Sequence, residues 1–209
     1  MMTTDALIAR LADGPPPPPF RPGRIAAIMI LSILLPVAAF LIVIGPRPEL
    51  ALAWRNPAVP FKTVLPLVLC VQSFVLALRL ARPAAQAPVG GWLLMPLACS
   101  AALWGGAYAL RSASERFAEV SPASVGECLG AIVVLSIIPA VAIMRVLRQG
   151  ASTKPGLSGG LIGLTAAAGA TTGYSLFCTQ DNPLFFVTWY GIAIVTITGA
   201  VMGARSLRW

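Results

Sequence analysis

The chain has 209 residues, of which 57% are hydrophobic and only 11% are charged, and its mean hydropathy is +0.84. Soluble domains carry about 25% charged residues, so this composition excludes an ordinary soluble domain and predicts a protein of the lipid bilayer. The net charge of +8 predicts basic cytoplasmic loops rather than direct binding of nucleic acid. The sequence has no histidine, which removes the commonest proton shuttle and metal ligand.

The first residues predict a short amphipathic helix. Thr4 and Asp5 offer side chains that cap a helix N-terminus, and an apolar stripe follows at helical spacing. This stripe consists of Leu7, Ile8 and Leu11. The helix cannot continue into the run of five prolines that follows, because proline lacks the backbone N–H that a helix interior needs.

The chain therefore divides into three segments. Residues 1–14 are the expected cytoplasmic amphipathic segment, residues 15–23 a proline-rich linker, and residues 24–209 a transmembrane domain. A helix as short as the first segment is marginal alone in water, so its apolar stripe needs a partner. Another protein is the expected partner, with the chain's own bundle and the bilayer surface as alternatives. The bilayer is disfavoured because acidic residues share the polar face of this helix.

Six apolar intervals between charged residues predict membrane spans, because a charged side chain in mid-bilayer costs ~3 kcal/mol or more. A hydrocarbon core of about 30 Å needs about 20 helical residues, which each interval nearly supplies. The expected spans are residues 25–44, 63–80, 91–110, 128–146, 159–178 and 185–204. The first follows the proline run and is expected to remain as a span rather than to be cleaved. The predicted fold class is an all-α membrane protein, a six-transmembrane-helix bundle preceded by the amphipathic helix.

The distribution of positive charge predicts the orientation. With the N-terminus inside, ten of the 15 Lys and Arg residues fall on inner segments and five on outer loops. The outer-loop cations are Arg47, Arg55, Lys62, Arg111 and Arg116. Because short loops rich in Lys and Arg stay on the cytoplasmic side, both termini are expected in the cytoplasm.

The last two expected spans carry glycines four positions apart. These pairs are Gly159/Gly163, Gly169/Gly173 and Gly199/Gly203. Small residues at this spacing let the backbones of neighbouring helices approach closely, so plain helix packing is the expected role.

The four cysteines fall into two classes. Cys70 and Cys99 lie inside expected spans, where thiols behave as small apolar residues. Cys128 opens the fourth span and Cys178 closes the fifth, so both are expected at the outer membrane face, where disulfides form and persist in a Gram-negative cell. Two antiparallel neighbouring spans could bring these thiols within bridging distance. The alternative is that they are unrelated small residues at helix ends.

Acidic residues stand next to the outer cysteines. Glu127 precedes Cys128, and Asp181 follows Cys178 by three positions. This surrounding would suit a cation bound across both thiolates, and thiolates select soft or heavy metal ions. A closed zinc site is not expected, because four good ligands are not apparent. On this interpretation the protein requires no cofactor, but a soft or heavy metal ion could bind at Cys128 and Cys178.

The sequence contains none of the common catalytic motifs. It has no phosphate-binding P-loop, no HExxH zinc motif and no nucleophile elbow. The expected apolar cores contain no ionisable residue, whereas transporters and proton pumps usually carry one. An enzyme and a small-molecule substrate are therefore not expected. Two alternatives remain, a membrane thiol-redox protein that exchanges electrons between outer thiols and a quinone, and a small permease.

A series of short motifs, in a fixed order, covers nearly the whole chain. They are Thr4-Asp5-x-Leu7-Ile8-x-x-Leu11, Gly45-x-Arg47-Pro48-x-Leu50, Lys62, Cys128, Pro139, Tyr174, Cys178, Asp181, Trp189-Tyr190, Gly199, Gly203 and Leu207-Arg208-Trp209. This order and spacing resembles the NrsF-type membrane anti-sigma factors, which are negative regulators of ECF sigma factors. The C-terminal stretch is the most specific part of the resemblance.

The resemblance implies a six-span protein that holds an ECF sigma factor at the cytoplasmic side of the bacterial inner membrane. It assigns Cys128 and Cys178 as the pair that senses heavy-metal or oxidative stress. It assigns binding of the sigma factor to the N-terminal segment, with Thr4, Asp5, Leu7, Ile8 and Leu11 as the residues. The cytoplasmic loops could share that contact.

Overall fold

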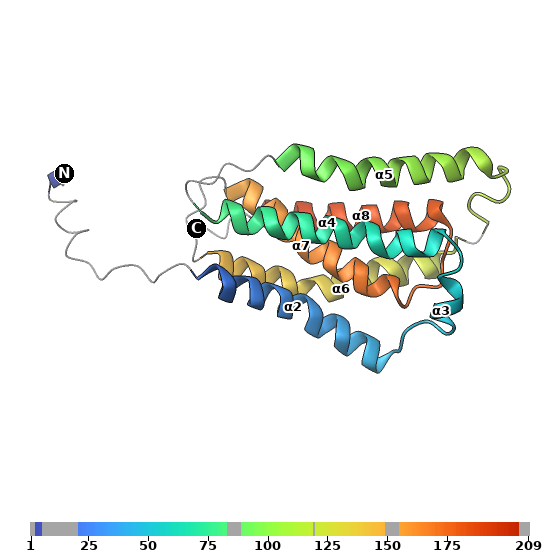
Figure 1. Cartoon of the computed structure of the whole chain (residues 1–209), viewed down its shortest axis with the longest axis horizontal. Coiled ribbons are helices and arrows are strands. Elements are labelled where there is room, and N and C mark those ends of the chain that lie inside the picture. Colours follow the sequence, from blue (N-terminus) through green and yellow to red (C-terminus); the bar gives the residue numbers. More distant parts are fainter. Residues whose placement is uncertain (1–2, 6–20, 83–88, 119, 149–154, 205–209) are drawn as a thin grey trace.

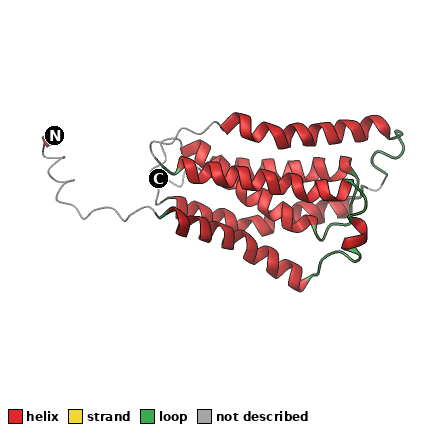
Figure 2. Cartoon of the chain, in the orientation of Figure 1, coloured by secondary structure: helices red, strands yellow, loops and turns green. Residues whose placement is uncertain are grey.

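The computed structural model describes residues 3–5, 21–82, 89–118, 120–148 and 155–204. Within these ranges every regular element is a helix, and six long helices form a bundle (Figure 1; Figure 2). The helices are α2 (Pro22–Val43), α3 (Leu50–Ala53), α4 (Ala58–Leu80), α5 (Val89–Leu110), α6 (Pro122–Leu147), α7 (Pro155–Ser175) and α8 (Pro183–Gly203). The all-helical class expected from the sequence is confirmed.

Each long helix begins two to six residues earlier than the charge-free intervals indicated. Four of them begin with a proline, namely Pro22, Pro122, Pro155 and Pro183. Proline is favoured in the first turn because the N–H that it lacks has no partner there in any case. At the start of α6, the Ser121 side chain accepts from the backbone N–H of Ser124, which completes the cap. Local start signals, not the limits of the apolar runs, set the helix ends.

Helix α7 lies at the centre of the bundle. It packs against α2, α4, α6 and α8, and 15 of its 21 residues are buried. It is built largely from Gly, Ala, Ser and Thr, whose small side chains allow four neighbours to pack closely around one helix.

The glycines of α7 mark the closest approaches. A Cβ added at Gly163 would lie 2.8 Å from the Cα of Thr198 in α8, and one at Gly169 would lie 2.7 Å from a side-chain carbon of α2. Gly199 and Gly203 on α8 have no atom within 4 Å of an added Cβ. Close packing through glycine therefore applies to α7 and not to the pair on α8.

The outside of the bundle is apolar. Large hydrophobic side chains are exposed on α2, α4, α5, α6 and α8, for example Leu35, Leu94 and Val195 at 63 to 71%. The same five helices are long and apolar enough to cross a membrane, as expected of a membrane protein. Helix α7 does not meet that hydropathy requirement, because small residues replace the large apolar ones. A sixth crossing, by α7, stays a prediction.

The N-terminal segment is described only in part. Thr4 and Asp5 are helical and exposed. Leu7, Ile8 and Leu11, together with most of the proline-rich linker, lie outside the described residues. The amphipathic helix and its role in sigma binding therefore stay predictions.

Candidate functional site

The expected site residues lie at one end of the bundle. Helix α2 begins and α8 ends at the opposite end, whereas the α2–α4, α5–α6 and α7–α8 connections lie together at this end, which we name the distal end (Figure 1). The α7–α8 connection carries Cys178 and Asp181. It is anchored at its last residue, because Asn182 accepts from Leu184 N at 3.1 Å and donates to the Arg116 carbonyl at 3.0 Å.

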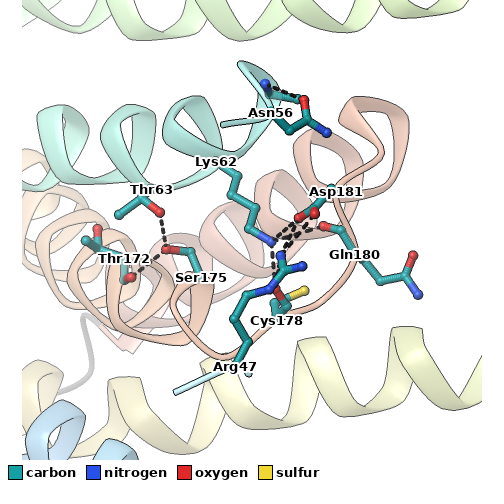
Figure 3. A network of polar contacts seen from close by, with 10 residues as sticks. Arg47, Asn56, Lys62, Thr63, Thr172, Ser175, Cys178, Gln180 and Asp181 are labelled. Atoms are coloured by element: carbon teal, nitrogen blue, oxygen red, sulfur yellow. Dashed lines mark hydrogen bonds and ion pairs between the residues drawn. The ribbon is translucent and has the colours of Figure 1, made fainter. Parts of the chain in front are cut away.

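Lys62 of α4 reaches into this connection with a fully buried side chain. Its ammonium donates to the Cys178 carbonyl at 2.6 Å, to Asp181 Oδ1 at 2.7 Å and to the Gln180 carbonyl at 3.3 Å (Figure 3). An ammonium has three donors, and all three have acceptors here. A buried charge needs this degree of pairing to be tolerated.

Arg47, which follows α2, approaches the same connection. Its guanidinium Nη1 pairs with Asp181 at 2.8 Å to Oδ1 and 3.0 Å to Oδ2, and its backbone N–H donates to the Leu176 carbonyl at 3.1 Å (Figure 3). The Arg47 and Asp181 side chains are 13% and 25% exposed, so the pair is largely shielded from solvent. We call Arg47, Lys62 and Asp181 the ion clamp. It holds the backbone on both sides of Cys178.

A hydroxyl pair continues the polar contacts beside the ion clamp. Thr63 Oγ1 and Ser175 Oγ lie 2.9 Å apart, and Ser175 Oγ also donates to the Thr172 carbonyl at 2.7 Å (Figure 3). Both hydroxyls are buried, so the pairing satisfies groups that have no access to water. Helix α4 is thereby fixed to the last turn of α7, directly before Cys178.

Cys128 and Cys178 lie in one buried cluster with Tyr174 and Tyr190. The cysteines are 0% and 5% exposed, and both are free thiols. The rings of Tyr174 and Tyr190 meet edge to face, with centroids 6.1 Å apart. The structure thus brings together two cysteines that are 50 positions apart in the sequence.

The comparisons with known proteins show the family of the chain. The model of the NrsF family, described as negative regulator of sigma F, matches residues 11–209. The chain belongs to this family. Anti-sigma-F factor NrsF of Caulobacter vibrioides is 29% identical over 214 residues, which cover 98% of this chain and 97% of the relative. Probable anti-sigma-F factor NrsF of Azospira oryzae is 29% identical over 195 residues, covering 90% and 85%. No solved structure matches the chain.

Seven of the residues that carried the resemblance to the NrsF family converge at the distal end. The convergent residues are Arg47, Lys62, Cys128, Tyr174, Cys178, Asp181 and Tyr190. They come from α4, α6, α7, α8 and two connections, so only the folded bundle assembles them. Of the other two cysteines, Cys70 belongs to the same buried cluster, with its Sγ 3.5 Å from the Thr165 carbonyl, and Cys99 is exposed.

The acidic neighbours do not complete a metal site with the cysteines. Glu127 is exposed, and the Asp181 carboxylate is engaged by Arg47 and Lys62. Among the described residues no group of three or more Cys, Asp or Glu could hold a metal ion. The donors that fit a soft ion are the two sulfur atoms of Cys128 and Cys178 themselves, because thiolates prefer such ions.

The assignment of Lys62 to an outer loop is wrong. Lys62 is in the second turn of α4 and fully buried. Spans predicted from charge-free intervals end at each charged residue, so this approach cannot place Lys62 inside the helix. Asn56, whose side chain accepts from Ala58 N at 3.1 Å, is the sequence signal that marks the true start.

Proposed function

We propose that this chain is an anti-sigma factor of the bacterial inner membrane, which holds an ECF sigma factor and releases it when the Cys128–Cys178 pair changes state. The observation that carries the proposal is the match to the NrsF family over nearly the full length, with relatives named as anti-sigma-F factors. Neither the family nor the site suggests a catalytic role. The sigma factor is the proposed partner on the cytoplasmic side, and the lipid bilayer surrounds the bundle.

The proposed topology has six crossings, with both termini in the cytoplasm. Five helices satisfy the requirement for a membrane span, and α7 runs alongside them between the end of α6 and the start of α8 (Figure 1). A helix enclosed by four neighbours does not need a lipid-compatible surface of its own, which explains the low hydropathy of α7. The distal end then faces the periplasm, and the N-terminal segment faces the sigma factor.

Sensing is proposed to act through the position of α6 relative to α7. Cys128 belongs to α6, and Cys178 follows α7 by three residues. A disulfide or a shared soft metal ion would tie the two elements together at the distal end. The change must reach the other end of helices about 30 Å long. Conversion of a bound population from 99:1 to 1:99 needs a change of about 5.5 kcal/mol in relative affinity, of which the new bond supplies part.

Co-sedimentation tests the anti-sigma activity. Membranes that contain the full chain should carry the candidate sigma factor into the pellet, and a chain without residues 1–14 should not. Leu7→Asp should reproduce the loss, because it places a charge on the apolar stripe, whereas Asp13→Ala should retain binding. Retention of the sigma factor by the truncated chain would move the contact to the cytoplasmic loops. Its absence from both pellets would refute the proposal.

The same assay with an inducer tests sensing. Addition of Cd²⁺ or a thiol oxidant should release the sigma factor from the full chain. Cys128→Ser and Cys178→Ser should retain the sigma factor after treatment, while Cys99→Ser, which changes an exposed thiol, should respond normally. A normal response of both distal variants would refute the sensing role and leave the anti-sigma role intact.

A further inference from the structure

An apolar cavity of about 530 Å³ lies between α4, α5 and α8, with Leu164 of α7 at its wall. On α8 its lining extends from Phe186 to Gly199, which corresponds to about 20 Å along the helix axis at 1.5 Å per residue. Helix α5 covers it at the edge of the bundle, where its other side is exposed. The cavity is therefore an elongated, partly open space that a hydrocarbon chain can enter from the bilayer.

Two hydroxyl groups at this cavity lack partners. Tyr190 and Thr198 both line it, and the Tyr190 hydroxyl and Thr198 Oγ1 are buried without a hydrogen-bond partner among the described residues. Tyr190 as a whole is only 4% exposed. A buried hydroxyl without a partner has lost the hydrogen bond that it would make to water, which makes a ligand with a hydrogen-bond acceptor favourable here.

Tyr190 also belongs to the buried cluster that contains Cys128 and Cys178, although neither cysteine lines the cavity. The two thiols in this cluster are almost inaccessible to water. Tyr190 is thus shared by the cavity and by the cluster that holds the candidate sensing pair.

The charges at the cavity select the head group. Lys62 is the charged residue among those that line it, and its three donors are engaged by Cys178, Gln180 and Asp181. The phosphate of a phospholipid or the carboxylate of a fatty acid would find no available cation here. The ligand needs a neutral head with acceptor oxygens and a long apolar tail.

We propose that this cavity binds an isoprenoid quinone, with a ring carbonyl accepting a hydrogen bond from Tyr190 and the tail lying along α8. Binding of the quinone is independent of the proposed sensing role, whereas one further step rests on that role. In that step the quinone oxidises Cys128 and Cys178: one S–S bond forms, two S–H bonds break, and two electrons and two protons pass to the quinone oxygens to give the quinol. The sensing pair thereby responds to the oxidation state of the membrane quinone pool.

The test measures binding of decylubiquinone to the purified full chain in phospholipid nanodiscs, without any sigma factor. Gly191 and Gly199 line the cavity, and an added Cβ at either meets no atom within 4 Å, so Gly191→Leu fills the cavity without a clash against the backbone. We expect it to weaken binding at least tenfold. Gly203→Leu is the matched control on the same helix, outside the cavity and equally unobstructed, and it should bind normally. Tyr190→Phe should weaken binding about fivefold, as expected for one lost hydrogen bond.

A second arm follows the thiols. Anaerobic incubation of the reduced chain with decylubiquinone should yield one quinol per chain and, after denaturation, block maleimide labelling at Cys128 and Cys178. Equal binding of decylubiquinone by Gly191→Leu and Gly203→Leu would overturn the site. A phospholipid bound in the cavity instead of the quinone would also overturn it. Binding without loss of thiols would overturn the oxidation step. Because neither arm contains a sigma factor, these failures are distinct from failure of the anti-sigma assay.

Discussion

Lys62 illustrates how a charge can be buried at the end of an apolar helix. Its ammonium lies at 0% exposure, yet it contacts two backbone carbonyls and one carboxylate, so no donor is left unpaired. Asp181 is shared with Arg47, which links α2 and α4 to one connection. Lys62 and Arg47 thus hold the backbone around Cys178 together.

Lys62→Met should destabilise the distal end. The substitution keeps the apolar part of the side chain and removes the ammonium, which leaves two carbonyls without this donor and Asp181 with Arg47 alone. Loss of one partner from a buried ion pair costs about 3–5 kcal/mol, and we expect the lower end because Arg47 remains. Unfolding in detergent should show this loss, together with faster maleimide labelling of Cys178.

Arg55→Met is the matched control for that measurement. Arg55 is an exposed cation in the connection before α4. Its replacement should change the free energy of unfolding by no more than about 0.5 kcal/mol. If Lys62→Met behaves like this control, the ion clamp does not hold the Cys178 connection.

At the scale of helices, α7 organises the bundle through small side chains. Its glycines let α2 and α8 approach its backbone, and its Thr and Ser hydroxyls bond to backbone carbonyls or to hydroxyls of α4. Thr165, for example, donates to the Leu161 carbonyl at 2.7 Å, so its own buried hydroxyl is paired. A helix of low hydropathy is therefore suited to the centre of a bundle.

Gly163→Ala should force α7 and α8 apart. The added methyl would lie 2.8 Å from the Thr198 Cα and 3.2 Å from the Ile197 carbonyl oxygen, and a backbone cannot turn away as a side chain can. Overpacking of this kind costs about 1–3 kcal/mol, measurable as reduced stability in detergent. Gly160→Ala on the same helix is the control, since its methyl would meet only the Met202 sulfur at 3.7 Å. Equal stability of the two variants would contradict close backbone packing of α7 on α8.

For the whole molecule, the number of crossings decides whether the membrane separates the proposed sensing pair from the proposed sigma-binding segment. Six long helices bring the start of α2 and the end of α8 to the same end of the bundle (Figure 1). If all six cross, the cysteine pair and the N-terminal segment lie on opposite sides of the membrane. If α7 did not cross, the C-terminus would lie on the other side.

Reporter fusions should give a cytoplasmic C-terminus. Green fluorescent protein fused after Trp209 should fluoresce, because it folds in the cytoplasm, and alkaline phosphatase fused after Glu115 should be active in the periplasm. The reversed pair of fusions serves as the control and should be inactive at both sites. An active phosphatase at the C-terminus would contradict a sixth crossing.

The composition and the spacing of charged residues predicted the helical class and the approximate extent of each long helix. They do so because a charged side chain in lipid carries a high free-energy cost, so charges are kept out of the middle of the spans. Proline and capping residues, such as Pro122 with Ser121, set the starts of the helices. These signals are present in the sequence, but they lie outside the apolar intervals from which the spans were predicted. The separation of Cys128 and Cys178 from Cys70 and Cys99 also followed from their positions in those intervals.

Only the tertiary structure decided what surrounds the cysteines. From the sequence, Lys62 is interpreted as a charge in a loop. Its three acceptors belong to the α7–α8 connection, more than 100 positions away in the sequence, so only the folded structure shows that its charge is paired. The central place of α7, the unpaired hydroxyl of Tyr190 and the cavity beside it depend equally on helices that are distant along the chain. Hydropathy reports how a helix meets lipid, whereas contacts between helices depend on side-chain shape and pairing, which a single sequence does not encode locally.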